Sequence, residues 1–178
     1  LFITNVLGFC DNIDAIAEYC ATENILLIED NCESMGTEYK GKKLGNYGLA
    51  STFSTYIGHH MSTIEGGMVC TDDRDLYINL IMTRAHWWDR NLPADIQEEI
   101  RAKYGVGGFY AKYAFYTLGY NVRPNEVNGF IGSDQIQYLD EIVTIREVNF
   151  KRFVEKVNSN PDFYPIVHEH IEKVSNFA

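Results

Sequence analysis

The order of apolar and amphipathic segments over the first thirty residues constrains the fold of this chain more than any other feature. Residues 1–6 form an apolar run. Residues 12–22 then repeat apolar side chains with the period of a helix. Residues 25–28 form a second apolar run, which ends in Glu29 and Asp30. Continuous apolar runs are typical of strands covered on both faces, so this order predicts a βαβ unit in a parallel sheet.

The rest of the chain is predicted to extend this α/β domain and then to leave it through helices. The expected elements are short strands at residues 51–56 and 67–71, a helix capped by Asp72 or Asp73 and ending near residue 84, a helix at about 94–104, and a long helical segment from Pro124 to about residue 157 with a break near residues 132–133.

Charge and cysteine usage argue against several classes of function. The chain has 25 acidic and 15 basic side chains and a net charge of −10, whereas a nucleic-acid or anionic-membrane surface needs a basic patch. No apolar stretch reaches the ~18–20 residues that span a bilayer, and no signal-peptide pattern opens the chain. The four cysteines show no CxxC pattern and no histidine at zinc spacing. This usage favours free thiols in a reducing cytoplasm and predicts no metal site.

Two polar residues at predicted strands are the first candidates for chemistry. Asp30 lies at the carboxyl end of a strand, where ligands of doubly wound sheets gather, although a carboxylate there can also simply cap a turn. Ser54 lies inside a short strand and can equally be a core residue. Residue type alone leaves both alternatives open.

A glycine-containing loop after that strand carries two adjacent histidines, His59 and His60. Adjacent side chains point in different directions, so we do not expect both to bind one metal ion. Glycines let a backbone approach a ligand closely, and a histidine in such a loop can act as a general base near neutral pH. Residues 119–123 form a polar turn before the long helical segment, and they can be a plain connector.

Four segments, in this order, are similar to motifs of one enzyme family. IEDNCE (residues 28–33) resembles the family's IEDxxQ or EDNCD, and FSTYIGHHMSTIEGG (residues 53–67) resembles FSFYPxKxLxxGEGG. RAHWWDRNL (residues 84–92) is similar to RSHGWxRxL, and GYNVR (residues 119–123) matches GYNxR. The chain therefore resembles the sugar aminotransferase and dehydratase family of the aspartate-aminotransferase fold.

This resemblance implies an α/β fold that is a fragment of the large, type I PLP-dependent transferase domain and leads by a long helix into a small domain. Residues 1–123 would be part of the large cofactor-binding domain, 124–157 the connecting helices, and 158–178 the start of an incomplete small C-terminal domain. The opening apolar run without a methionine fits the middle of a longer protein. We expect this fragment alone to bind cofactor poorly and to be inactive.

His59 occupies the position at which the family has the lysine that forms a Schiff base with the cofactor, and no lysine occurs between Lys43 and Lys103. In the family this exchange marks the sugar 3-dehydratases, and the motifs resemble best the branch that acts on GDP-linked 4-keto-6-deoxy-mannose. The resemblance implies pyridoxal 5′-phosphate or pyridoxamine 5′-phosphate as cofactor. His59 would be the catalytic base that removes a proton from the cofactor and the acid that protonates the leaving C3 hydroxyl.

The same resemblance assigns cofactor contacts and partners. Asp30 would pair with the ring nitrogen, Ser54 with the phosphate, and Asn121 with a phosphate in the neighbouring subunit of a homodimer with shared sites. Glu33 stands where the family has Gln or Asp near the ring hydroxyl, so we expect its contact with the cofactor ring to be altered. Trp87 replaces the family's glycine, so we expect the sugar pocket to be altered as well. A nucleotide sugar of lipopolysaccharide-type deoxysugar biosynthesis is the expected substrate, with glutamate as amino donor.

Three other functions stay open at this point. An iron–sulfur-dependent CDP-sugar 3-dehydratase would match Cys32, but its further cysteines have no counterpart between residues 84 and 120. A sugar aminotransferase would have to work without the lysine. A non-catalytic homologue would have no need for the retained Asp30, Ser54 and Asn121.

Overall fold

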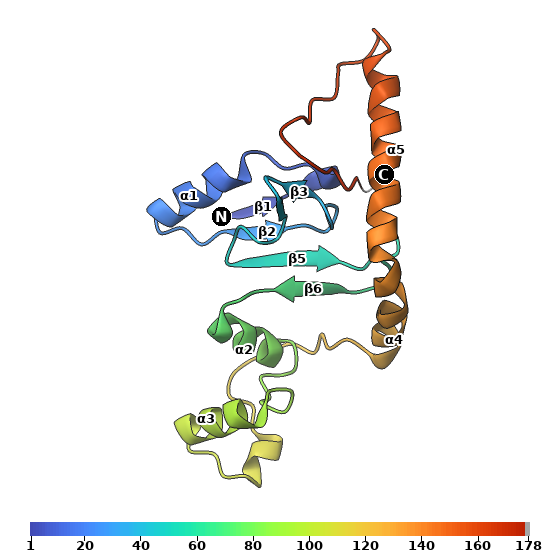
Figure 1. Ribbon diagram of the computed structural model, residues 1–178. Helices are drawn as coiled ribbons and strands as arrows, with labels where there is room; N and C mark the ends of the chain where they lie inside the picture. Colours follow the sequence, from blue (N-terminus) through green and yellow to red (C-terminus); the bar gives the residue numbers. More distant parts are fainter. Residues whose placement is uncertain (177–178) are drawn as a thin grey trace. The chain divides into compact units, whose positions relative to one another are not determined.

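The computed structural model describes residues 1–176 and divides the chain into two compact units (Figure 1). Leu1–Cys70 together with Asn125–Ala178 form what we call the sheet unit, and Thr71–Pro124 form the helical unit. The predicted domain limits at residues 123 and 157 concern the whole protein and stay a prediction. The last two residues of the predicted C-terminal segment lie outside the described residues.

A four-stranded sheet forms the centre of the sheet unit, in the order β1 (Phe2–Thr4), β2 (Ile28–Asp30), β5 (Ala50–Ser54), β6 (Gly67–Cys70). The first three strands are parallel and β6 is antiparallel to β5. The predicted α/β fold is confirmed.

The second strand lies later in the sequence than its apolar run predicted. Ile25 instead closes helix α1 (Ile13–Thr22), because Asn24 adopts a left-handed backbone with φ 54° and the Ile25 N–H donates to the Cys20 carbonyl at 2.7 Å. This hydrogen bond belongs to the Schellman arrangement that ends many helices. The apolar run was therefore divided between a helix end and a strand, and Leu26 is 65% exposed.

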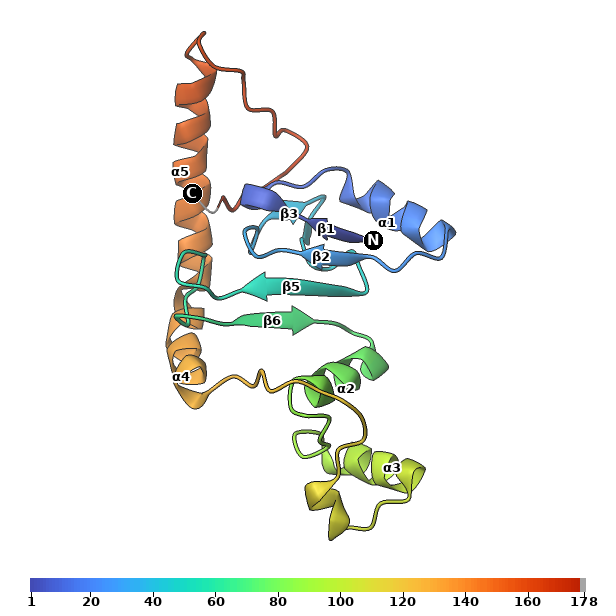
Figure 2. The same cartoon turned by 180° about the vertical axis from the view of Figure 1, so that it is seen from behind.

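The core of the sheet unit packs α1 and the hairpin of β3 (Glu38–Tyr39) and β4 (Lys42–Lys43) against the long helix α5 (Leu139–Asn158). Its buried residues are Cys10, Ile13, Cys20, Leu27, Tyr39, Leu44, Phe150, Val154, Ile171 and Val174. Figures 1 and 2 show α5 running past the carboxyl ends of the parallel strands. A helix in this place can contact residues of the loops that follow β2 and β5.

The helical segment begins and breaks at positions other than those predicted. Helix α4 covers Glu126–Gln135, and its N-cap is Asn125, whose side chain accepts the Asn128 N–H. Pro124 therefore precedes the cap instead of opening the helix. The break is a single 3-10 turn at Ile136–Tyr138 rather than at residues 132–133, since glycine and serine are tolerated inside α4.

The helical unit contains α2 (Arg74–Thr83) and α3 (Ala94–Tyr104), followed by a 3-10 turn at Tyr110–Tyr113. The bounds of α3 are those predicted, and of the two predicted caps of α2 it is Asp73 that caps the helix. Buried Met82, Leu92 and Ile96 form its small core. None of the helices in residues 1–176 is long and apolar enough to cross a membrane.

Candidate active site

The carboxyl ends of the parallel strands gather polar side chains, as the position of Asp30 predicted. Asn5 follows β1, Asp30 ends β2 and Ser54 ends β5. Beneath them the buried Asn5 side chain donates to Asn31 Oδ1 at 2.7 Å. A hydrogen-bonded amide pair at this depth fixes the two strand ends relative to each other.

Asp30 is held by two donors. Its Oδ1 accepts the Thr52 hydroxyl at 2.9 Å and the Cys32 N–H at 3.1 Å. The second contact shows that Asp30 caps a turn, which is the structural role that the sequence had left open beside ligand binding. The Cys32 thiol also hydrogen-bonds to this carboxylate. A carboxylate oriented in this way can present Oδ2 to a ligand.

Ser54 and Thr52 are two residues apart in β5, so their side chains lie on the same face of the sheet. This is the face on which Thr52 contacts Asp30. Ser54 Oγ accepts the Tyr56 N–H at 3.1 Å, and this hydrogen bond lies at the start of the following loop. Its hydroxyl hydrogen is still available to donate, because a hydroxyl both donates and accepts. Ser54 is half-buried rather than a core residue.

The loop that carries His59 is a closed hairpin-like structure. The Thr55 N–H donates to the Gly66 carbonyl at 3.0 Å, and Thr63 Oγ1 contacts Thr55 Oγ1 at 2.6 Å. A Cβ at Gly66 would lie 2.7 Å from both threonine hydroxyls, so this position needs glycine. Asn128 of α4 donates to the Thr63 carbonyl at 2.6 Å and ties the loop to the helix.

His59 is positioned from both sides. Its N–H donates to the Tyr56 carbonyl at 2.9 Å, and its imidazole packs edge-on against the Tyr56 ring at 5.6 Å between centroids. Its carbonyl accepts the guanidinium of Arg146, a residue of α5, at 3.3 Å. The same guanidinium donates to the Asn176 carbonyl at 3.2 Å. The backbone of the half-buried His59 is therefore fixed by Tyr56 of the same loop and by Arg146 of α5.

His60 is buried, and its Nε2 contacts the Ser175 carbonyl at 3.0 Å. Burial lowers the pKa of His60 from 6.5 to about 4. The two histidines therefore differ in role: His60 is a neutral donor to the C-terminal segment, whereas His59 is only half-buried. Residues 1–176 contain no group of three His, Cys, Asp or Glu side chains that could hold a metal ion. The expectation that the two histidines do not share a metal ion stays a prediction.

Glu33 lies near the same strand ends, and its Oε2 accepts the N–H of Leu7 at 2.9 Å. Leu7 has a left-handed backbone with φ 54°, so this carboxylate stabilises an unusual turn after β1. The predicted contact of Glu33 with the cofactor ring stays a prediction.

Asn121 belongs to the helical unit, where two family-like motifs pair with each other. Asn121 forms an isolated bridge with Ala85, and the His86 N–H donates to the Tyr120 carbonyl at 2.7 Å. A Cβ at Gly119 would lie 2.7 Å from the Trp87 nitrogen, so the two segments meet without room for a side chain. The residues 119–123 are thus a fixed segment, and Asn121 is exposed on it.

Trp87, which stands where the family has glycine, has a left-handed backbone with φ 58°. Its side chain packs against the core of the helical unit. The backbone shape that glycine would favour is thus kept, and the indole adds buried apolar surface. The sequence predicted an altered sugar pocket here, and that stays a prediction.

Sequence reasoning missed three residues that build the site. Thr52 could have been found because it lies two residues before Ser54 in the same strand, and therefore on the same face of the sheet. Asn128 and Arg146 come from helices more than sixty residues after the loop, and no local pattern marks either one.

The sequence pattern of the DegT/DnrJ/EryC1/StrS aminotransferase family matches residues 1–178. The chain belongs to this family. A GDP-4-keto-6-deoxy-D-mannose 3-dehydratase of Yersinia pseudotuberculosis is 41% identical over 161 residues, which cover 90% of this chain and 40% of that protein. This member of the family thus spans about two-fifths of the length of that relative.

Solved structures agree with this assignment. An E. coli GDP-4-keto-6-deoxy-D-mannose 3-dehydratase with bound hydrated PLP matches with a TM-score of 0.83 and 36% identity, over 99% of this chain and 44% of that one. A GDP-4-keto-6-deoxymannose 3-dehydratase with a trapped PLP–glutamate geminal diamine matches with a TM-score of 0.82 and 36% identity, over 98% and 44%. The family member described here therefore shares the fold of PLP-binding dehydratases over nearly its whole length.

Proposed function

We propose that the whole protein is a PLP- or PMP-dependent nucleotide-sugar 3-dehydratase, which removes the C3 hydroxyl of a nucleotide-linked 4-keto-6-deoxyhexose in deoxysugar biosynthesis. The observation that carries this proposal is His59, which stands in the position of the family's lysine on a loop fixed by Tyr56 and Arg146. The relatives named as 3-dehydratases support it.

The residues at the strand ends fit the cofactor. A protonated pyridine nitrogen needs a carboxylate acceptor, and Asp30 offers Oδ2 while Oδ1 is held by Thr52 and Cys32. A phosphate needs donors, and the Ser54 hydroxyl at the end of β5 can supply one. When bound, the cofactor supplies an electron sink for the carbon–oxygen cleavage. Asp30 keeps the ring nitrogen protonated and so maintains that sink.

His59 moves the protons of the reaction. An imidazole cannot form the imine that the lysine forms, but it can accept a proton near neutral pH and return it. We assign it both steps: removal of a proton from the cofactor's methylene carbon and protonation of the departing C3 hydroxyl. His60 cannot replace it, because His60 is buried and its Nε2 contacts Ser175.

We also propose glutamate as the amino donor, a homodimer in which Asn121 reaches a phosphate of the neighbouring subunit, and a cytoplasmic location. The relative trapped with a PLP–glutamate geminal diamine supports the first of these. The four free thiols fit a reducing compartment.

The test uses the intact protein with cofactor, glutamate and a nucleotide-linked 4-keto-6-deoxyhexose, followed by mass analysis of the sugar. A product one oxygen poorer, with glutamate consumed, supports the 3-dehydratase. An amino sugar shows amine transfer without the lysine and contradicts the proposal, as does unchanged sugar. His59→Asn should abolish turnover and keep the cofactor's absorbance spectrum, whereas His168→Asn, far along the chain, should keep both.

A further inference from the structure

Helix α4 approaches the loop of His59 along one face. Asn128 and Gly132 are four residues apart in α4, so they lie on the same face of the helix. A Cβ at Gly132 would lie 3.2 Å from the methyl group of Thr63, a residue of the loop. Glycine has a low helix propensity, but at this position it lets the helix come close enough for the Asn128 amide to reach the loop.

The amide of Asn128 holds the loop at two points. Its Nδ2 donates to the Thr63 carbonyl at 2.6 Å and to the Glu65 carbonyl at 2.9 Å. These two carbonyls flank Ile64, whose backbone is left-handed with φ 73°. A backbone conformation of this kind persists only where surrounding contacts hold it. Asn128 therefore holds the segment of the loop that is most strained.

This hold reaches His59 through the hydrogen bonds between the two arms of the loop. The Ile57 N–H donates to the Ile64 carbonyl at 3.1 Å, and Ile57 lies two residues before His59. A displacement of residues 63–65 would therefore move the backbone that carries the imidazole. Arg146 of α5 contacts the His59 carbonyl on the other arm, so the two arms are held by different helices.

We propose that Asn128 is a positioning residue for His59, which fixes the place from which the imidazole removes and returns a proton. The inference rests on the proposed function for the role of His59. Asn128 acts through the loop and is not itself assigned a contact with cofactor or substrate. Proton transfer requires the base within hydrogen-bond reach of the proton, and a misplacement of about 1 Å can lower a rate by about 100-fold.

The test measures kcat and KM of the intact holoenzyme with a nucleotide-linked 4-keto-6-deoxyhexose. Asn128→Asp keeps the size of the side chain and removes both hydrogen bonds to the loop. Because an acidic residue is favourable in the first turn of a helix, α4 itself is not weakened. We expect kcat to fall by about 10-fold or more, with KM changed by less than about 2-fold and the cofactor's absorbance spectrum retained. The solvent deuterium isotope effect on kcat should rise, because proton transfer becomes slower.

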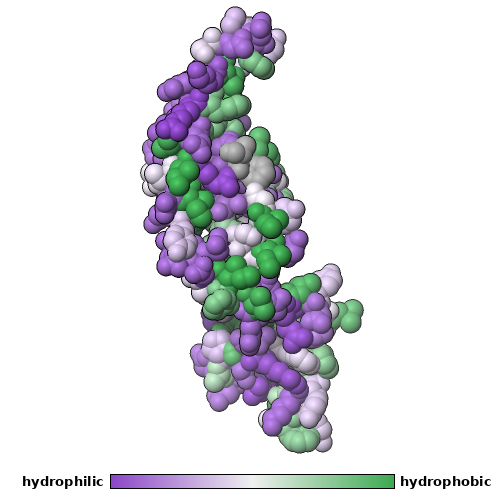
Figure 3. All heavy atoms as spheres, turned by 90° about the vertical axis from the view of Figure 1, so that its right-hand side faces the viewer, coloured by the Kyte–Doolittle hydropathy of each residue, from purple (hydrophilic) through white to green (hydrophobic). Residues whose placement is uncertain are grey.

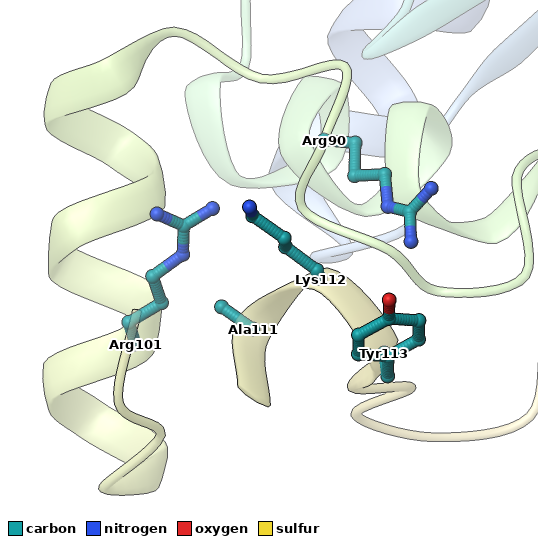
Figure 4. Close-up of a pocket in the computed structure, with 5 residues that line it drawn as sticks. All are labelled: Arg90, Arg101, Ala111, Lys112 and Tyr113. Atoms are coloured by element: carbon teal, nitrogen blue, oxygen red, sulfur yellow. The ribbon is translucent and has the colours of Figure 1, made fainter. Parts of the chain in front are cut away.

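The contacts of Asn128 stay within the sheet unit, to which both α4 and the loop belong. The helical unit contains a pocket of about 430 Å³, shown in Figure 4 and lined by Arg90, Arg101, Ala111, Lys112 and Tyr113. Asn128→Asp changes none of these residues. A fall in kcat can therefore be traced to the loop of His59.

Two further variants show whether the amide is responsible. Asn158→Asp is the matched control, because Asn158 also donates from Nδ2 to a backbone carbonyl, that of Ile166 at 3.3 Å, but at the last residue of α5. It should leave kcat unchanged. Asn128→Gln keeps an amide donor and should retain more of kcat than Asn128→Asp does. The reverse order of these two variants would contradict the role of the amide.

Hydrogen exchange at the Ile57 amide separates this inference from the proposed function. Exchange there should accelerate in Asn128→Asp, since the partner carbonyl of Ile64 is no longer held. If the unaltered protein dehydrates its substrate and Asn128→Asp does so at the same kcat, the positioning role is overturned and the proposed function stands. A protein that does not dehydrate any such sugar refutes the proposed function and the link to proton transfer, while faster exchange at Ile57 would still show that Asn128 holds the loop.

Discussion

At the scale of single residues, the chain keeps two left-handed backbone positions without the glycines that the family motifs place there. Ile64 has φ 73° and Trp87 has φ 58°. For an ordinary residue this conformation costs about 1–2 kcal/mol, and a β-branched side chain makes it an outlier. Trp87 offsets the cost by packing, partly buried, against the core of the helical unit, whereas Ile64 is 56% exposed and has no such compensation.

Ile64→Gly should therefore stabilise the protein. Relief of about 1–2 kcal/mol of backbone strain exceeds the ~0.4–1 kcal/mol that glycine's extra freedom in the unfolded chain costs, which leaves a gain of about 0.5–1 kcal/mol. Urea denaturation would measure it. Ile57→Gly is the control, since Ile57 is similarly exposed in the same loop and is not among the residues with positive φ. It should lower stability, and a loss in both variants would contradict the strain argument.

His60 should make stability depend on pH. Its pKa is about 4 in the folded protein, because burial disfavours the charged imidazole, and near 6.5 in the unfolded chain. Between pH 4 and pH 6.5 the unfolded state therefore binds a proton at His60 that the folded state does not bind. The contribution of His60 to stability is complete above pH ~6.5 and falls as the pH drops toward 4. Denaturation at pH 7 and pH 5 should show a loss of about 2 kcal/mol that His60→Gln removes. Equal losses in both proteins would show that other groups carry the effect.

At the scale of elements, the sequence predicted those parts of the fold whose determinants are local. Helix α3 was predicted with its observed bounds, and the cap of α2 was predicted to be Asp72 or Asp73, because periodicity and capping chemistry lie within one segment. The start of β2 was missed, since the turn at Asn24 competes for the same apolar run. The strand-end placement of Asp30 followed from sheet topology, but Arg146 could not be found because its contact depends on where α5 passes the sheet.

The cap of α2 provides a test at this scale. Asp73 Oδ1 accepts the Leu76 N–H at 2.7 Å, so Asp73→Ala should cost about 1 kcal/mol. Amide exchange at Leu76 should accelerate and report the open first turn. Asp72→Ala, one residue earlier, removes the same charge without removing the cap and should change stability by less than about 0.5 kcal/mol. A similar loss in both variants would mean that charge near the helix start, not the cap, is responsible.

At the scale of the whole molecule, apolar surface stays exposed in the sheet unit. Helix α4 has no buried residue, and Phe130 and Val127 on it are 78% and 62% exposed. Strand β6 is exposed along its whole length and forms one edge of the sheet. Figure 3, which views the side on which α4 and α5 lie, shows hydrophobic patches among hydrophilic ones. Contiguous exposed apolar surface and unpaired edges both favour association.

The 178-residue chain on its own should therefore self-associate. Sedimentation velocity should show a species whose mass rises with protein concentration. Phe130→Lys should shift this equilibrium toward the monomer, because it places a charge on the exposed face of α4. Phe163→Lys is the control, since Phe163 is 59% exposed but lies outside α4 and the sheet. A monomer at every concentration would contradict the expectation.

The loop of His59 has one further consequence, in the order in which the chain is made. Its backbone is held by Arg146, and Arg146 in turn holds Asn176, while His60 contacts Ser175. The ribosome therefore exposes the loop more than a hundred residues before Ser175, the partner of His60, emerges. Domains fold as their segments become available during synthesis. His59, the proposed proton-transfer residue, thus reaches its final position late in translation, and a nascent chain that has folded its sheet still lacks the finished His59 loop.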